Sequence, residues 1–178
     1  KFISLWNISS NASAHLVMYE IKKTWQIPMQ NPTDSGAAIL IRFFTKYPSN
    51  QTKFASFKDI PVTELHVSDV EKKFKAHAIR IIRIFDESIN SLLCDDGCDS
   101  KLEQIWSKIA ATHFKRQIEK QAYNELKEVI LEVLTAVCNL NENQTAAWTK
   151  LVDCVYAILF CTLDKLTLLQ FLNTDSYF

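Results

Sequence analysis

Glycine and proline are scarce in this chain, with two glycines and four prolines among 178 residues. Tight turns depend on both residue types, because glycine supplies positive φ and proline presets the backbone of a turn. So few of them cannot support the many turns of a β-sandwich or a β-barrel. The scarcity predicts an all-α fold of long helices joined by a few connections.

Apolar residues recur every three or four positions along several segments, which is the pattern of one buried helix face. The clearest case is a helix expected over residues 69–92, where Ser68 and Glu71 have the spacing of a capping box. A shorter apolar stripe runs through residues 102–113. Four further helices are expected over residues 13–26, 34–47 (with Asp34 as the N-cap), 119–140 and from 143 onward.

The composition excludes several classes of protein. Lys and Arg together equal Asp and Glu at 20 each, so the net charge is zero and gives no electrostatic basis for binding nucleic acid. Hydrophobic residues make up 48% of the chain, which is too many for a disordered segment. The longest nearly unbroken apolar run, residues 154–163, has about half the length that a bilayer-spanning helix needs. We expect no transmembrane segment, and a buried core helix at this run.

The cysteines point to a reducing compartment. There are five, an odd number, and Cys138, Cys154 and Cys161 lie in apolar helical stretches. Buried free thiols and a cytoplasmic location are therefore expected. Cys94 and Cys98 lie in an acidic loop expected over residues 94–100, where a local disulfide is the less favoured alternative.

The length fits one domain. We expect a domain over residues 13–164, an N-terminal extension over 1–12 and a C-terminal extension over 165–178, in which 166–172 could continue the last helix. Because the chain begins with Lys1 rather than methionine, a further segment can precede it in a longer protein.

Two histidines interrupt two apolar stripes. His77 lies within the helix expected over 69–92, and His113 ends the stripe over 102–113. A buried imidazole needs a partner, and for a lone histidine a backbone carbonyl or a hydroxyl is the ordinary one. Two such histidines among aromatic residues also fit a shared metal-containing ligand in a flat apolar slot. The aromatic residues available for its walls are Phe43, Phe44, Phe54, Phe57, Phe74 and Phe85.

Other kinds of site fit the sequence less well. A structural zinc site needs four ligands at short spacings, and Cys94 with Cys98 has no second pair at the expected offset. His15 and His66 are expected at the surface. The hydrolase motif Gly-x-Ser-x-Gly, the zinc-protease motif His-Glu-x-x-His and the Walker sequence do not occur. We therefore expect a protein without dedicated catalytic residues, not an enzyme.

From about residue 13 to residue 164 the sequence resembles the globin family. Segment 43–48, FFTKYP, followed by 54–57, FASF, is similar to the junction of the globin B and C helices and the corner after it. Segment 74–78, FKAHA, is similar to the globin E helix, 109–114, IAATHF, to the end of the F helix, and 143–148, NQTAAW, to the start of the H helix. Trp25 fits the A helix. The closest likeness is to invertebrate, nematode-like neuronal globins.

The resemblance implies a globin fold, with helices A to H around a pocket for haem b. It implies that Phe54 stacks on the haem ring, that His113 is the proximal iron ligand and that His77 is the distal histidine. The second ring nitrogen of His113 should donate to a backbone carbonyl one turn back or to Thr112. The residues implied to surround the haem are Leu40, Phe44, Phe54, Phe57, Phe74, Ile81, Ile109, Ile118, Tyr123 and Leu126.

Several roles stay open at this point. Arg80 either reaches a haem propionate or is a solvated helix cation. His77 either binds the iron directly, giving a six-coordinate haem for redox or gas sensing, or hydrogen-bonds oxygen on a five-coordinate iron. We prefer the first, because Leu40 at the distal position offers no hydroxyl to hold oxygen. A haem-free helical interaction domain is the third alternative. The expected partners are haem, oxygen or another diatomic gas, an unidentified redox partner and a second copy in a homodimer.

Overall fold

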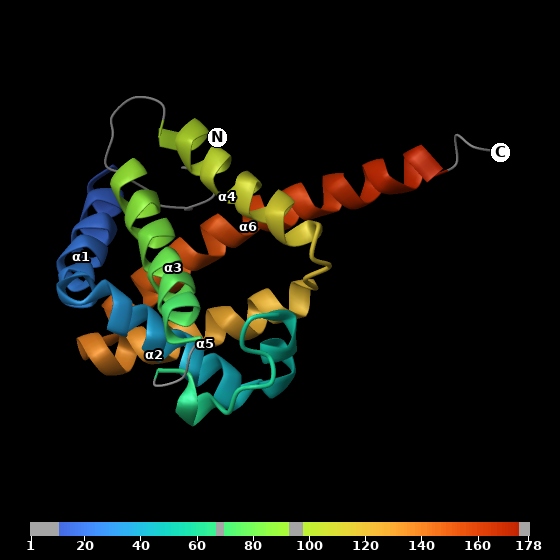
Figure 1. Cartoon of the computed structure of the whole chain (residues 1–178). Coiled ribbons are helices and arrows are strands. Elements are labelled where there is room, and N and C mark those ends of the chain that lie inside the picture. Colours follow the sequence, from blue (N-terminus) through green and yellow to red (C-terminus); the bar gives the residue numbers. More distant parts are fainter. Residues whose placement is uncertain (1–10, 67–69, 93–97, 175–178) are drawn as a thin grey trace.

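The computed structural model describes residues 11–66, 70–92 and 98–174. These residues form six α-helices and two 3-10 helices and contain no strand, which confirms the all-α prediction (Figure 1). The elements in chain order are α1 (Asn11–Gln30), α2 (Pro32–Lys46), η2 (Pro48–Lys53), η3 (Val62–Glu64), α3 (Glu71–Ser91), α4 (Cys98–Phe114), α5 (Lys120–Cys138) and α6 (Glu142–Thr174).

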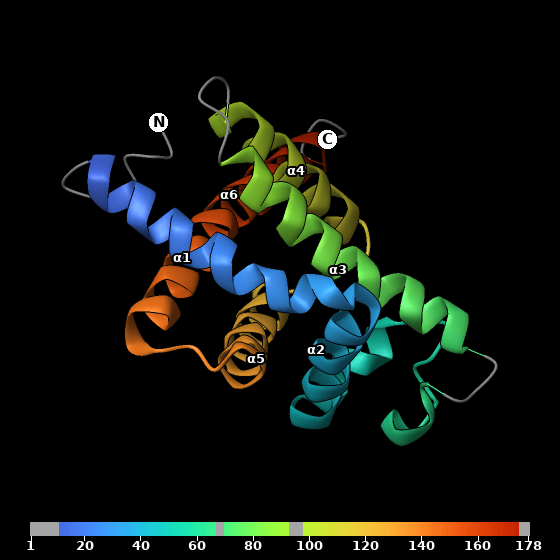
Figure 2. The ribbon, with the colours of Figure 1, turned by 90° about the vertical axis from the view of Figure 1, so that its left-hand side faces the viewer.

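The helices pack as two main pairs. α2 packs on α3, α4 packs on α6, and α1 crosses α3 and α6 (Figures 1 and 2). The largest fully buried side chains, among them Trp148, Phe44 and Phe74, lie between these helices. α6 continues as one helix to Thr174, so residues 166–172 extend the last helix as expected. Its end projects beyond the other helices (Figure 1).

Gly36 sets how closely α2 and α3 approach each other. It is buried, and a Cβ atom built at this position would lie 2.1 Å from the carbonyl oxygen of Ala78 in α3. The two helix backbones are therefore in direct contact, which only glycine permits here. Since Ala78 follows His77, this contact also fixes the position of His77 relative to α2.

The helix starts differ in detail from the sequence-based expectations. Asn31, not Asp34, is the N-cap of α2, because its side chain accepts the backbone N–H of Asp34 at 3.3 Å. Pro32 then occupies the first turn, where its missing N–H costs nothing. Ser68 of the expected capping box lies outside the described residues, and Glu71 pairs with Lys75 at 2.6 Å.

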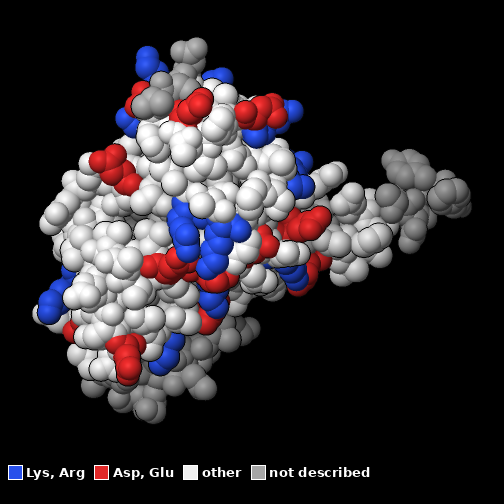
Figure 3. All heavy atoms as spheres, turned by 90° about the horizontal axis from the view of Figure 1, so that it is seen from below, with Lys and Arg blue, Asp and Glu red and all other residues white. Residues whose placement is uncertain are grey.

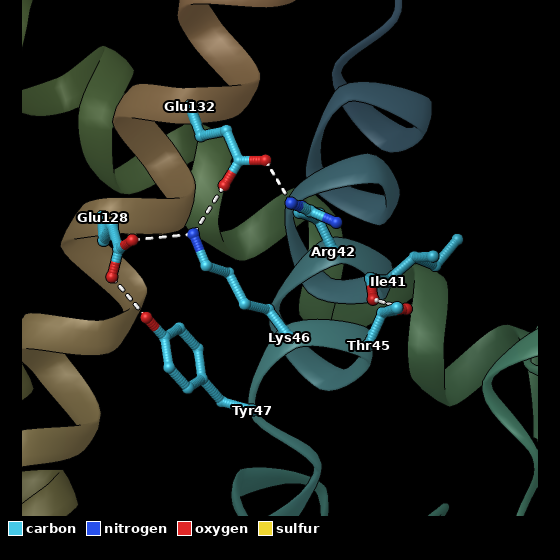
Figure 4. Close-up of polar contacts among 7 residues, drawn as sticks. All are labelled: Ile41, Arg42, Thr45, Lys46, Tyr47, Glu128 and Glu132. Atoms are coloured by element: carbon cyan, nitrogen blue, oxygen red, sulfur yellow. Dashed lines mark hydrogen bonds and ion pairs between the residues drawn. The ribbon is translucent and has the colours of Figure 1, made fainter.

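A polar network joins α2 to α5 (Figure 4). Lys46 Nζ lies 2.7 Å from Glu128 Oε1 and 3.0 Å from Glu132 Oε2. Arg42 pairs with Glu132 at 2.5 Å, and the Tyr47 hydroxyl donates to Glu128. These charges of opposite sign neutralise each other at the surface. Figure 3 shows the same kind of mixing, with basic and acidic side chains side by side near the middle of the face seen from below.

The cysteines only partly match expectation. The thiols of Cys138 and Cys154 are buried, but Cys161 is exposed, so its predicted burial was wrong. It lies on the outward face of α6, in line with the exposed residues Asp153 and Ala157. The less favoured alternative, a disulfide between Cys94 and Cys98, lies outside the described side chains. Ser100, expected in a loop, belongs to α4.

In the three described ranges, none of the helices combines the length and the apolar character that crossing a membrane requires.

Candidate functional site

A cavity of about 710 Å³ lies between α2, α3, α4, α5 and α6. Its size falls within the range of about 300–1,000 Å³ that is typical of ligand and cofactor sites. Both stripe histidines, His77 and His113, line it from different helices. The other predicted site residues that line the cavity are Leu40, Phe54, Arg80, Ile81, Ile109, Ile118, Tyr123 and Leu126.

Three predicted wall residues lie elsewhere. Phe44, Phe57 and Phe74 are buried in the core and do not line the cavity, so their expected place in its wall is corrected. Their rings instead form an aromatic cluster with Phe54, on the side of Phe54 that faces the core and not the cavity. Phe44 and Phe57 lie 5.0 Å and 5.1 Å from Phe54 between ring centroids, and Phe74 lies 5.8 Å from Phe57.

His77 enters the cavity from α3. Its ring meets the ring of Phe54 edge to face, with centroids 4.9 Å apart and an interplanar angle of 88°. Burial lowers the pKa of His77 to about 4, and repulsion from His113 in its protonated form and from the positive charges of Arg80 and Arg116 adds to this. The imidazole is therefore neutral at pH 7, which leaves a nitrogen lone pair that can bind a metal ion.

His113 lies in the last turn of α4, where a hydrogen bond orients its ring. Its Nδ1 lies 2.9 Å from the carbonyl oxygen of Ile109, one turn back, as expected. Because a carbonyl only accepts, Nδ1 carries the proton and Nε2 keeps its lone pair. Thr112 is not the partner, since its hydroxyl donates to the carbonyl of Lys108 at 2.9 Å. Burial lowers the pKa of His113, while the bond to Ile109 opposes that shift.

Gln51 holds the loop after η2, which carries Phe54, through hydrogen bonds to the loop backbone. It is 7% exposed, and its side-chain amide donates to the carbonyl oxygens of Phe57 at 2.8 Å and Ile60 at 2.6 Å. Next to it, Asn50 donates to Glu125 of α5 at 2.7 Å. Sequence reasoning missed both residues, because their role follows from loop geometry and leaves no periodic pattern.

Basic side chains also line the cavity. Arg80, Arg116, Lys53 and Lys108 all contribute to its wall and are themselves exposed. Among the described residues, Arg80 and Arg116 have no ion-pair partner within 4.0 Å. The site therefore combines an apolar interior, two neutral imidazoles and free positive charge at its exposed edge.

Tyr123 places a buried hydroxyl next to the cavity. Its side chain is 5% exposed, and its hydroxyl has no hydrogen-bond partner among the described residues. Its ring lies 5.9 Å from the ring of His113. Burial raises the pKa of Tyr123, so the phenol stays protonated.

Replacing Tyr123 with phenylalanine should therefore stabilise the protein. The variant keeps the ring but removes a hydroxyl that loses its hydration without gaining a bond, a penalty of about 1–3 kcal/mol. We expect the free energy of unfolding in urea to rise by about 1 kcal/mol. The control is Tyr47→Phe, which removes the bond to Glu128 and should not stabilise. A less stable Tyr123→Phe variant would show that this hydroxyl has a partner after all.

Comparison with known proteins gives the family of this chain. The family model named Globin matches residues 37–159, well over half of the chain. Globin CTT-VI of Chironomus thummi thummi is 29% identical over 169 residues, covering 93% of this chain and 99% of that protein. Cytoglobin-1 of Oryzias latipes is 31% identical over 147 residues, covering 80% of this chain and 77% of that protein.

A solved structure agrees with these sequence matches. It is the hexa-coordinate hemoglobin of Drosophila melanogaster, described in a study of cyanide binding and transitions of the heme cavity. It is 54% identical to this chain, has a TM-score of 0.75, and the match covers 81% of this chain and 91% of that one.

This chain belongs to the globin family, which confirms the resemblance and the globin fold. Haem b is its cofactor, and the residues of the cavity fit that group. Two neutral imidazoles can serve as iron ligands, apolar walls can enclose the ring, and the exposed arginines can meet its anionic propionates. The family match speaks against a haem-free interaction domain. The likeness to nematode globins stays a prediction.

Proposed function

We propose that this globin binds haem iron through both His113 and His77, and that the six-coordinate haem acts in redox chemistry or in sensing diatomic gases. One observation carries the proposal: two neutral imidazoles from two separate helices, α3 and α4, line the same apolar cavity. A neutral histidine nitrogen is the commonest protein ligand for iron in haem.

His113 is the proximal ligand in this proposal. Its hydrogen bond to the carbonyl of Ile109 orients the ring and keeps Nε2 deprotonated, as metal-binding histidines require. When bound, the haem supplies an iron that exchanges electrons or binds a gas. The protein residues set which of these is easier by controlling access to the sixth iron position.

His77 is proposed to occupy that sixth position. Phe54 restrains its ring from one side, and Leu40 offers no hydroxyl that could stabilise bound oxygen. The relative from Drosophila melanogaster is a hexa-coordinate hemoglobin by its description, which supports the same state here. The second candidate is an oxygen-storing globin, in which His77 hydrogen-bonds the gas on a five-coordinate iron.

The positive side chains at the cavity edge are proposed to bind the haem propionates. Arg80, expected from the sequence, is joined there by Arg116, which was not expected. Both lie close enough to His77 for their charges to lower its pKa. Arginines that have no ion-pair partner among the described residues suit two carboxylates, because guanidinium groups pair with carboxylates in bidentate geometry.

The absorption spectrum of the reduced, haem-loaded protein tests the coordination. Two histidine ligands should give sharp, split visible bands, and His77→Leu should change these to a single broad band. Carbon monoxide should bind the variant faster, because no internal ligand has to leave first. A wild-type spectrum with one broad band that shifts at once on adding oxygen would overturn the six-coordinate state in favour of oxygen storage.

The remaining parts of the proposal concern the surroundings of the protein. The thiols of Cys138 and Cys161, neither of which is in a disulfide, support a cytoplasmic location. Leu168 and Leu169, 60% and 55% exposed on the projecting end of α6, support a homodimer, which sedimentation at several concentrations would test. A redox partner and the absence of dedicated catalysis stay predictions from the sequence.

A further inference from the structure

We propose that two copies of this chain pair along α6, so that the projecting end of each α6 lies in a groove of the other copy. The inference rests on the homodimer proposed above and names the two surfaces that form it. The first surface is the arm, which consists of residues 166–174 at the end of α6. The second surface is the groove, which lies between α1 and the start of α6.

The arm is apolar and exposed. Its sequence is LTLLQFLNT, which contains no charged residue. The large apolar side chains that are more than half exposed on it are Leu168, Leu169, Phe171 and Leu172. Figure 1 shows that this end of α6 projects beyond the other helices. A contiguous exposed apolar surface of this kind is typical of an interaction site.

The groove lies at the opposite end of α6. It has a volume of about 380 Å³. Its apolar lining residues are Leu16, Val17, Ala146 and Ala147. Leu16 is 62% exposed, so the groove presents an apolar side chain to solvent. Lys150 of α6 contributes a positive charge to the lining. The groove can therefore accept an uncharged, apolar helix end.

The length of α6 prevents the arm from reaching the groove of its own chain. The part of α6 between Ala146 and Leu168 is roughly 33 Å long, because an α-helix rises 1.5 Å per residue. A continuous helix does not fold back on itself, so the arm needs the groove of another molecule. An antiparallel pair of α6 helices, related by a two-fold axis, places each arm at the groove of the other copy. Such an isologous contact closes the assembly at two copies.

The middle of α6 suits this two-fold axis. In the antiparallel arrangement, Leu168 lies level with Lys150 of the second copy. The axis then passes between Ala157 and Cys161. Both of these side chains are small and exposed, and they lie four residues apart on one face of the helix. Small side chains at a contact let two helices approach closely. This agreement between the midpoint and the small residues favours a second copy as the partner.

The charged residues on the exposed face of α6 fit the same register. Asp164 pairs with Lys120 of α5 at 2.6 Å. Asp153 pairs with Lys127 of α5. Lys165 has no ion-pair partner among the described residues, and in the dimer it lies level with Asp153 of the second copy. Opposite charges at the same level of two helices favour that register.

Sedimentation of the full, haem-loaded chain at several concentrations tests the contact. We expect the wild type to form a dimer. Leu168→Lys should raise the dissociation constant of the dimer by at least roughly tenfold, because it puts an ammonium group level with Lys150 of the other copy. Adding Lys150→Glu to Leu168→Lys should restore the dimer, because the new carboxylate then lies level with the new ammonium group. This rescue is specific to the proposed register.

Cys161 reports the position of the axis independently. A short bismaleimide should join Cys161 to Cys161 of the second copy, and peptide mass spectrometry locates the cross-link. Leu168→Lys should lower the yield of this cross-link. The matched control is Ile27→Lys, which changes another exposed apolar residue, 40% exposed and on α1 away from the groove. It should leave both the dimer and the cross-link unchanged.

Several results would overturn the inference. A haem-loaded wild type that stays monomeric at every concentration would defeat the proposed homodimer as well. A dimer that Leu168→Lys does not weaken would keep the homodimer but place its interface elsewhere. A double variant that stays monomeric would defeat the antiparallel register. A monomer that floats with phosphatidylcholine vesicles, and fails to do so as Leu168→Lys, would show that the arm binds a lipid surface instead.

Discussion

Replacing His113 with alanine should abolish stable haem binding. The variant loses the imidazole whose Nδ1 is held by Ile109 and whose Nε2 is proposed to bind the iron. The apolar walls would still attract the ring, but a ligand bond that fixes it would be gone. After haem titration and gel filtration, the wild type should keep its Soret absorbance and the variant should lose most of it within the run.

Two comparisons make this result specific. His66→Ala removes an exposed histidine and should leave haem retention unchanged. Added imidazole should partly restore haem binding to His113→Ala, because it can enter the space of the missing ring. Full retention of haem by His113→Ala, with an unchanged spectrum, would show that another residue is the proximal ligand.

Replacing Gly36 with valine should cause the largest loss of stability of any single substitution considered. The Cβ alone would lie 2.1 Å from the carbonyl oxygen of Ala78, so α2 and α3 would have to move apart. Overpacking of this kind costs about 1–3 kcal/mol where side chains can yield. Here the obstacle is backbone, and we expect a loss of more than about 4 kcal/mol, measured by thermal and urea unfolding.

Thr45→Val is the control for Gly36→Val. It changes an exposed position on the same helix and should alter stability by less than about 1 kcal/mol. The displacement of α3 should also reach His77, so any folded Gly36→Val protein should show an altered visible spectrum. A variant that melts like the wild type would mean that the two helices separate without cost.

The two cavity histidines could be found from the sequence because helical periodicity depends only on residues that are close together in the chain. Helical periodicity places each imidazole on an apolar face, and a carbonyl one turn back from His113 lies within reach of its ring in any helix. The family motifs then supplied what periodicity could not, namely that the two faces meet at one cavity. The backbone partner of His113 was predicted correctly for the same local reason.

The residues that were missed or misplaced depend on contacts between distant segments. Gly36 is notable only because Ala78, on another helix, lies against it. Trp106 lines the cavity, whereas Phe74, on an equally apolar stripe, lies behind it. Periodicity shows which face of a helix is buried, but not whether that face meets a cofactor or another side chain. Arg116 was missed because an exposed cation near a helix end has many ordinary explanations.

The mixing of positive and negative side chains on the surface affects how fast this globin associates with a protein partner. Arg42 and Lys46 lie against Glu128 and Glu132, and basic and acidic side chains lie side by side on the face seen in Figure 3. Over the whole sequence, positive and negative side chains are equal in number. Away from the basic edge of the cavity, such a surface projects little electric field beyond a few ångströms of solvent. Encounters with a protein partner are then unsteered collisions, with association rate constants of about 10⁵–10⁶ M⁻¹ s⁻¹ that change little with ionic strength.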